Sequence, residues 1–343
     1  MDRETLGIVA FPFLFLLLAF RVPIGLAMLL VGSAGTAMIA GWLPIFSQVK
    51  TSAWHLFSNY SLSVIPLFLL MGNLASRAGM SEALFKFASA CLGHRKGGVA
   101  MAAVGACAGF GAICGSSLAT AATMGKVALP ELRRLGYSGS LSTGALAAGG
   151  TLGILIPPSV ILIIYSILTE QNIAKMFLAA LVPGILAALG YIVTIAIFVR
   201  LVPGSGRAQQ RITMAGRMSY FRNIWHVLLI FTFMLSGIYL GWFTPTEGAA
   251  VGAAGTGLVA MFQKNFDLSA LLDVIQSTAI TSGMIFLVLL GAEFFNSFIA
   301  LTQLPVLLAS FVTEGGFSPL VVVAAILVLY LLLGCLMDSM AMI

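Results

Sequence analysis

Charged residues are scarce in this sequence of 343 residues. Asp, Glu, Lys and Arg together make up 8% of it, against about 25% in a soluble globular domain. Hydrophobic residues make up 60%. The composition excludes a soluble domain and predicts an all-α polytopic membrane protein, because helices satisfy their own backbone groups in lipid. We therefore interpret the net charge of +6 as a signal of membrane orientation and not of nucleic-acid binding.

Motifs for metal, redox and nucleotide chemistry are also missing. The four cysteines form no CxxC pair and lie in or beside apolar stretches, which is typical of packing residues and not of a disulfide frame or a transition-metal site. The three histidines form no cluster, and no GxxxxGK[ST] loop is present. Asp2 and Glu4 are incompatible with the positive start of a cleaved signal peptide.

Long apolar runs dominate what remains. A membrane span needs about 20 such residues. The predicted spans are 6–20, 23–42, 61–76, 142–168, 176–200, 224–242, 244–262 and 278–301. Segments 80–92 and 265–277 mix charged residues with Leu, Phe and Ala at helical spacing, which predicts interfacial helices. Two further apolar stretches, 97–125 and 319–343, need a separate argument.

The basic residues orient the chain. Segment 200–222 holds five arginines and no acid, so we expect it to be cytoplasmic. Counting spans backwards puts Lys126, Arg133 and Arg134 in the cytoplasm, and the charge rule places Arg95 and Lys96, upstream of 97–125, there as well. As a continuous helix this stretch is about 43 Å long, too short to cross and return. It is predicted to be a re-entrant hairpin that turns near Gly115-Ser116-Ser117; a single crossing that breaks the charge rule is the alternative. This topology leaves only Arg3, Lys50 and Lys175 outside among the 17 basic residues.

Glycines and hydroxyls interrupt the middle of this hairpin, from Gly109 to Gly125. A helix opened within the membrane is tolerated only where it is buried in protein or lines a watery cavity. The interruption therefore indicates a site, although small residues also permit close helix packing.

A weak internal repeat divides the chain. Pro23 resembles Pro245 in its surroundings, Gly72 resembles Gly291, and Gly115 aligns with Asp338, at offsets of 222, 219 and 223 residues. The charge count places the two halves in opposite orientations. We therefore expect a first repeat at 1–200, a basic cytoplasmic linker at 201–223, and a second repeat at 224–343. Stretch 319–343 then begins a second hairpin, and about 80 residues that would match the rest of the first half are expected to be absent.

Several segments resemble a known family. These are Gly115 to Gly125, Leu129-Pro130-Glu131-Leu132, Gly144 to Ser159, Phe243 to Glu247 and Gly334 to Met342. They are similar to the signature of the large membrane subunit of tripartite ATP-independent periplasmic (TRAP) transporters. Family members continue past the second hairpin, where this chain stops.

The resemblance implies an elevator-type, ion-transporter-like fold of inverted repeats with two re-entrant hairpins. It also implies a non-enzymatic permease of the bacterial inner membrane that imports an organic acid, a dicarboxylate or a sugar acid, together with sodium. The expected partners are a small four-helix membrane subunit and a periplasmic substrate-binding protein. No cofactor is expected beyond sodium as the coupling ion.

Broken helices suit this role. Free N–H groups at a half-helix start favour a carboxylate, and free carbonyls at a half-helix end favour Na⁺. The Pro157-Pro158 pair is a second break that frees carbonyls one turn earlier, unless it is only a kink. The candidate substrate residues are Ser116, Ser117, Thr120, Pro157, Pro158 and Asp338. The candidate sodium ligands are Gly115, Ser116, Gly150, Thr151, Gly153, Asp338 and Ser339.

Other acids and other functions remain open. Asp338 is either a site residue or a solvated acid; Glu293 lines a cavity or bonds another helix; Glu247 reads best as part of a capping box with Thr244. A passive channel is one rival function, which the inverted repeat disfavours. An intramembrane hydrolase with Ser116 or Ser117 as nucleophile is another, but no histidine lies within a predicted span near the same depth to serve as base.

Overall fold

The computed structural model describes every residue except 1, 264–265, 336–338, 340–341 and 343, and the described residues form helices without strands. The elements are α1 Arg3–Ala19, α2 Ile24–Ala40, α3 Trp42–Ser58, the 3₁₀ turn η1 Tyr60–Ser63, α4 Val64–Arg77, α5 Met80–Leu92, α6 Gly98–Cys114, α7 Ser117–Arg134, α8 Gly139–Leu155, α9 Val160–Leu168, α10 Ile173–Leu201, α11 Met214–Tyr239, α12 Pro245–Met261, α13 Leu268–Leu301, α14 Leu304–Glu314 and α15 Pro319–Gly334. The predicted all-α class is confirmed.

Local sequence sets many of the helix starts. Many helices begin after a Ser, Thr or Asn whose side chain accepts a backbone N–H of the first turn. These helices are α7, α8, α9, α10, α11, α12 and α15. At α12 the bond is reciprocal, because the Glu247 side chain also accepts from the Thr244 N–H at 2.8 Å. The predicted capping box is confirmed, and it accounts for Glu247 without a role in binding.

The predicted spans all form helices, but of unequal length. α10, α11 and α13 are long and apolar enough to cross a membrane, and two pairs of helices, α3 with η1–α4 and α8 with α9, also qualify if each pair is one span. α1, α2, α4 and α12 have 14 to 17 residues. α3 was not expected. α13 joins the predicted interfacial helix 265–277 and span 278–301 into one helix of 34 residues, about 51 Å long.

The chain forms two compact units. Unit 1 contains residues 1–62 and 280–343, and unit 2 contains residues 63–279. Each unit therefore combines segments from both halves of the sequence repeat.

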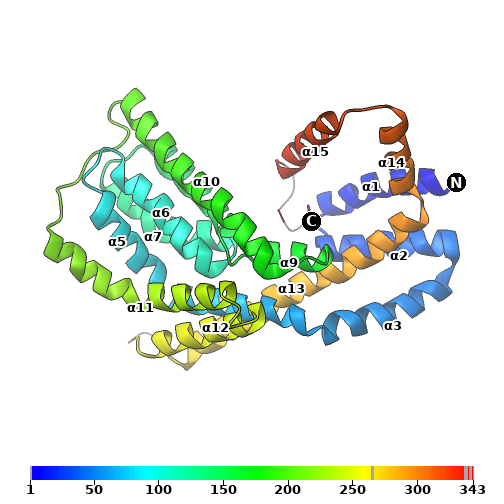
Figure 1. The fold of residues 1–343 in the computed structure, drawn as a ribbon, viewed down its shortest axis with the longest axis horizontal. Helices are drawn as coiled ribbons and strands as arrows, with labels where there is room; N and C mark the ends of the chain where they lie inside the picture. The colour runs from blue at the N-terminus through cyan, green and yellow to red at the C-terminus, as the bar shows by residue number, and fades with distance from the viewer. Residues whose placement is uncertain (1, 264–265, 336–338, 340–341, 343) are drawn as a thin grey trace. The chain divides into compact units, whose positions relative to one another are not determined.

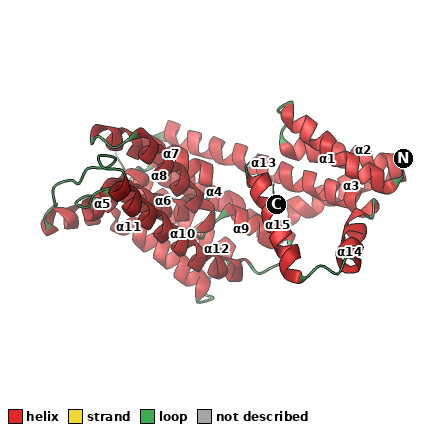
Figure 2. Ribbon diagram, turned by 90° about the horizontal axis from the view of Figure 1, so that it is seen from above, coloured by secondary structure: helices red, strands yellow, loops and turns green. Residues whose placement is uncertain are grey.

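Unit 2 is built around α6. This helix packs against α4, α5, α7, α8 and α10, while α12 packs on α4, and α11 packs on α5 and α12. Figure 1 shows α5, α6 and α7 next to one another, and Figure 2 shows α8 beside them. Most of α6 is buried, including Val99, Cys107 and Phe110 at 0% exposure. Its alanines and glycines allow this crowding, because small side chains let neighbouring backbones approach.

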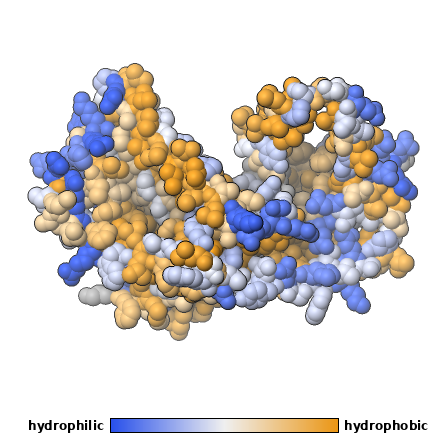
Figure 3. All heavy atoms as spheres, in the orientation of Figure 1, coloured by the Kyte–Doolittle hydropathy of each residue, from blue (hydrophilic) through white to orange (hydrophobic). Residues whose placement is uncertain are grey.

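α10 leaves one apolar face uncovered. Exposed residues recur along it at helical spacing: Leu178, Val182, Ile185, Leu186, Leu189, Val193 and Ile197. Figure 3 shows hydrophobic atoms along the side of unit 2 that α10 occupies in Figure 1. An uncovered apolar stripe on a helix of 29 residues is what contact with lipid requires.

The polar linker after α10 is fixed to the rest of unit 2. The buried Tyr137 hydroxyl donates to the Arg207 carbonyl at 2.8 Å and accepts from the Val99 N–H at 3.2 Å. The Gln209 N–H donates to the Gly93 carbonyl at 2.8 Å. The segment between α10 and α11 therefore lies against the first residues of α6 and the end of α5.

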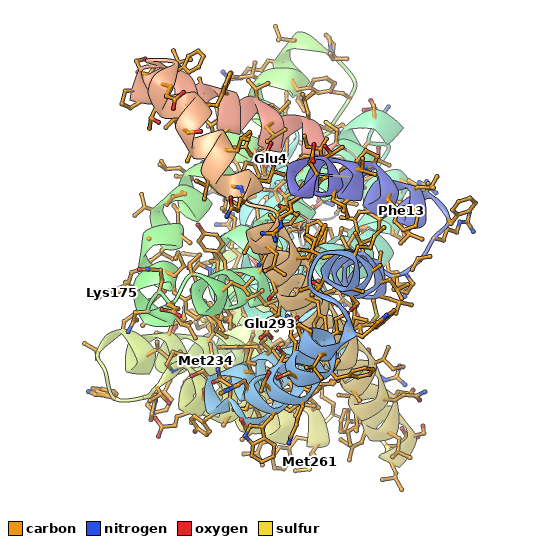
Figure 4. The ribbon with its side chains drawn as sticks, turned by 90° about the vertical axis from the view of Figure 1, so that its right-hand side faces the viewer. Glu4, Phe13, Lys175, Met234, Met261 and Glu293 are labelled. Carbon is orange, nitrogen blue, oxygen red and sulfur yellow. The ribbon has the colours of Figure 1, made fainter. Side chains whose placement is uncertain are left out.

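Unit 1 is held by α1, α2 and α13. Its core contains Ala10, Leu14, Ala27, Val31, Phe295 and Phe298. A side chain at Gly25 would meet the backbone of Leu287, and one at Gly291 would meet the Gly25 carbonyl, so α2 and α13 touch backbone to backbone. Glu293 accepts a hydrogen bond from the buried Ser52 hydroxyl at 2.7 Å. Of the two interpretations of Glu293, the structure shows the bond to another helix, α3, which Figure 4 shows next to it.

Gly291 provides a test of the α2–α13 contact. Gly291→Ala should lower the free energy of unfolding by about 1–3 kcal/mol, because the added methyl group has no space beside the Gly25 carbonyl. Thermal melting in detergent, followed by tryptophan fluorescence, measures the change. Gly283→Ala is the matched control on the same helix, since nothing lies within 4 Å of its added methyl group. Equal melting temperatures for the two variants would contradict the contact.

Candidate functional site

The first helix break lies between α6 and α7. Gly115 has φ +65°, a left-handed conformation that glycine adopts without steric penalty. Ser116 then caps α7 by accepting the Ala119 N–H at 3.4 Å. The expected turn at Gly115-Ser116-Ser117 is therefore present. It leaves the first N–H groups of α7, those of Ser117 and Leu118, without helical acceptors.

The second break lies between α8 and α9, whose axes are bent by 41°. Pro157 and Pro158, joined by a cis peptide bond, lie inside it and are buried. Because proline has no N–H, the carbonyls of Gly153 and Ile154 lose the donors that a continuous helix would supply. Ser159 is fully buried and caps α9 by accepting the Leu162 N–H at 3.4 Å. The predicted second breakpoint is confirmed.

The two breaks are in direct contact. The Val160 N–H donates to the Gly115 carbonyl at 3.2 Å. A side chain at Gly111 would lie 2.5 Å from Gly153 Cα, so the backbones of α6 and α8 touch. The two interpretations of the small residues, close helix packing and a binding site, are therefore compatible, because the glycines bring the broken helix ends together.

Thr120 lies at the centre of this contact. It is 0% exposed, and its Oγ1 has no hydrogen-bond partner among the described residues. A methyl group placed on Gly153 would lie 2.7 Å from both Thr120 Oγ1 and the Ser116 carbonyl oxygen, so these two oxygens converge on one point of α8. An unsatisfied buried hydroxyl costs about 1–3 kcal/mol, which a bound ion or ligand would recover. Uncharged oxygen ligands of this kind suit a hard cation such as Na⁺.

Other candidate residues lie apart from this point. Thr151 is exposed and its Oγ1 lies 2.7 Å from the Ala148 carbonyl and 3.2 Å from the Tyr191 hydroxyl, so it faces α10. Gly150 lies inside the continuous helix α8, against Ala121. Ser117 is half-buried at the start of α7.

The predicted second hairpin belongs to the other unit. Asp338 lies outside the described residues, and Ser339 belongs to unit 1. The site that the structure describes is therefore the one within unit 2.

Gly111 is a site residue that the sequence prediction passed over. It supports the contact with Gly153 but contributes no polar side chain. A usable signal was present, because Gly111 and Gly115 are four residues apart, as are Gly149 and Gly153. The GxxxG spacing places two glycines on one helix face and is typical of close helix contacts in membranes.

The sequence of this chain is similar to those of known membrane transport proteins. Three relatives are TRAP transporter permeases by name. The C4-dicarboxylate large permease of Pseudomonas aeruginosa is 37% identical over 318 residues, which cover 91% of this chain and 73% of the relative. The sialic acid permease of Haemophilus influenzae is 32% identical over 83% of this chain and 46% of the relative. The isethionate permease of Oleidesulfovibrio alaskensis is 29% identical over 96% of this chain and 51% of the relative.

The chain thus spans about half the length of two of these relatives and about three quarters of the first. Residues 11–343 match the family model described as "Tripartite ATP-independent periplasmic transporter, DctM component". With its glycine-lined helix breaks and apolar helices, the chain belongs to this family of membrane transport subunits, which are not enzymes.

Proposed function

We propose that this chain is the large subunit of a secondary transporter that uses a sodium gradient to import an organic acid across the bacterial inner membrane. One observation supports it most. Two broken helices meet at Gly115 and Val160, and they enclose the buried hydroxyl of Thr120, which has no hydrogen-bond partner among the described residues. Open helix ends inside a membrane protein are typical of transporter binding sites.

The chemistry of the breaks fits both partners of such a symport. The N-terminal ends of α7 and α9 carry partial positive charge and free N–H groups, which attract a carboxylate. Carbonyls at the C-terminal end of α8, notably that of Gly153, together with Thr120 Oγ1, offer neutral oxygens to Na⁺. The proposed substrate residues in unit 2 remain Ser116, Ser117, Thr120, Pro157 and Pro158, and Asp338 is proposed to act from the second hairpin.

The names of the relatives support a substrate class. The three relatives are named for C4-dicarboxylates, sialic acid and isethionate, all of which are organic anions at neutral pH. We propose an organic anion for this chain too, delivered by a periplasmic binding protein. A small membrane subunit is the proposed partner within the bilayer. The proposed elevator motion would carry α6 to α9 together, and all four lie in unit 2.

Sodium coupling can be measured directly. The chain, reconstituted in liposomes with its small subunit and its binding protein, should take up the organic acid held by that binding protein only under an inward sodium gradient. Potassium in place of sodium is the control. Uptake that is equal in both salts would contradict sodium coupling. A passive channel would be favoured if the substrate crosses without the binding protein and never accumulates above its external concentration.

Thr120 tests the position of the ion. Thr120→Val should lower the apparent sodium affinity of uptake about tenfold or more, because it removes one oxygen ligand. The melting temperature without sodium should stay the same or rise, because the variant removes a buried hydroxyl that has no partner among the described residues. Thr143→Val, at an exposed position on α8, is the matched control. An unchanged sodium affinity in Thr120→Val would place the ion elsewhere.

A further inference from the structure

A charged cavity lies away from the helix breaks. It has a volume of about 710 Å³ and opens within unit 2 between α5, α7, α11 and the linker residues Gln209 and Ile212. Polar side chains of α5 and α7 line it: Glu82, Lys86, Ser89, Lys126, Glu131 and Arg134. An adjoining hollow of about 520 Å³ shares Arg134 and Gln209 with it and adds Arg207. The linker wall is fixed in place by the bond from the Gln209 N–H to the Gly93 carbonyl.

The cations of this cavity outnumber its anions. Glu82 pairs with Lys86 at 2.5 Å, and Glu131 pairs with Arg134 at 2.6 Å. The Arg134 guanidinium, with a smaller contribution from Lys86, holds the pKa of Glu131 below its usual value. Glu82 and Glu131 are therefore each already paired with a basic side chain. Lys126 and Arg207 make no ion pair with any described residue, and they leave the cavity net positive.

One polar group of the cavity wall is buried without a hydrogen-bond partner among the described residues. Ser89 Oγ on α5 is inaccessible to solvent and makes no hydrogen bond within the described part of the chain. Leaving a buried hydroxyl unpaired is unfavourable. An anion with several oxygens would accept from this serine and from a basic side chain together.

The cavity also has an apolar wall, and the sequence indicates its level in the membrane. Phe85, Val127, Pro130 and Ile212 contribute to its lining. Tyr220 lies in the second turn of α11, a candidate membrane span, so the cavity lies at the end of that span where lipid headgroups are found. The surrounding arginines predict this end to be cytoplasmic, and the cytoplasmic leaflet carries anionic lipids.

We propose that this cavity binds the phosphate-bearing headgroup of an anionic phospholipid, with Lys126 and, in the adjoining hollow, Arg207 as its principal contacts and the apolar wall beside the glycerol. Basic pockets between membrane helices bind such headgroups in general. This proposal concerns a site separate from the helix breaks and does not depend on the transported substrate.

Lipid titration tests the proposal. The purified chain in neutral detergent is titrated with phosphatidylglycerol or phosphatidylcholine, and bound lipid is counted by native mass spectrometry. Phosphatidylglycerol should bind more tightly than phosphatidylcholine. Lys126→Gln and Arg207→Gln should each weaken its binding about fivefold, the usual effect of one basic residue near an anionic membrane surface. Arg200→Gln, at an exposed arginine that does not line the cavity, should leave it unchanged.

Three outcomes would overturn the proposal. These are equal binding of the two lipids, equal weakening by Arg200→Gln, and full competition by glycerol 3-phosphate at matched concentration, which would mark a site for soluble phosphate esters. Both variants should fold, since Lys126 and Arg207 are exposed and make no ion pair with the described residues. An unchanged phosphatidylglycerol affinity in either variant would contradict the assignment.

Discussion

The contact between the backbones of α6 and α8 is the constraint on which the functional part of the molecule depends. A broken helix inside a membrane protein exposes N–H and carbonyl groups that lipid cannot satisfy. Here each break supplies a hydrogen-bond partner to the other, since the Val160 N–H donates to the Gly115 carbonyl. Only glycines at 111 and 153 allow that approach, because a side chain at either position would overlap the opposite helix or the start of α7. The caps at Ser116 and Ser159 satisfy further groups and leave the remaining helix ends available to a ligand.

The division of the chain into two units bears on how the two helix breaks could move together. All four helices of the two breaks lie within unit 2, and so does the linker that Tyr137 fixes to α6. Unit 1 combines the first 62 residues with residues from 280 onward, so each half of the sequence repeat contributes to both units. A transporter of the proposed elevator type needs its binding site carried by one body. The two described breaks lie in a single unit, whereas the proposed second hairpin belongs to unit 1 by sequence.

Local signals in the sequence were sufficient to predict the helix breaks and the helix caps. They were insufficient to predict the direction in which side chains point and where some helices begin. Glycine, proline and hydroxyl residues act on the backbone nearest to them, so the turn at Gly115 and the box at Thr244 were predictable. The direction in which Thr151 points depends on how α8 is rotated against α10, which only tertiary packing decides. α3 was passed over because Gln48, Lys50 and Ser52 make it too polar for a span; Gln48 and Ser52 bond α13 instead. The charged start of α13 suggested a boundary near 277 that the helix does not have.

The absence of charge at the breaks bears on coupling. No Asp, Glu, Lys, Arg or His occurs between residues 109 and 125 or between 149 and 160. A carboxylate bound there alone would be stabilised only by helix ends, and a sodium ion only by neutral oxygens. Bound about 5 Å apart, the two would attract each other by about 3 kcal/mol at an effective dielectric constant near 20. That attraction corresponds to a coupling of more than a hundredfold, and it is reciprocal. On the proposed function, the uncharged breaks of unit 2 therefore make each ligand bound there depend on the other, whereas a fixed positive charge at the breaks would let the organic anion bind without sodium.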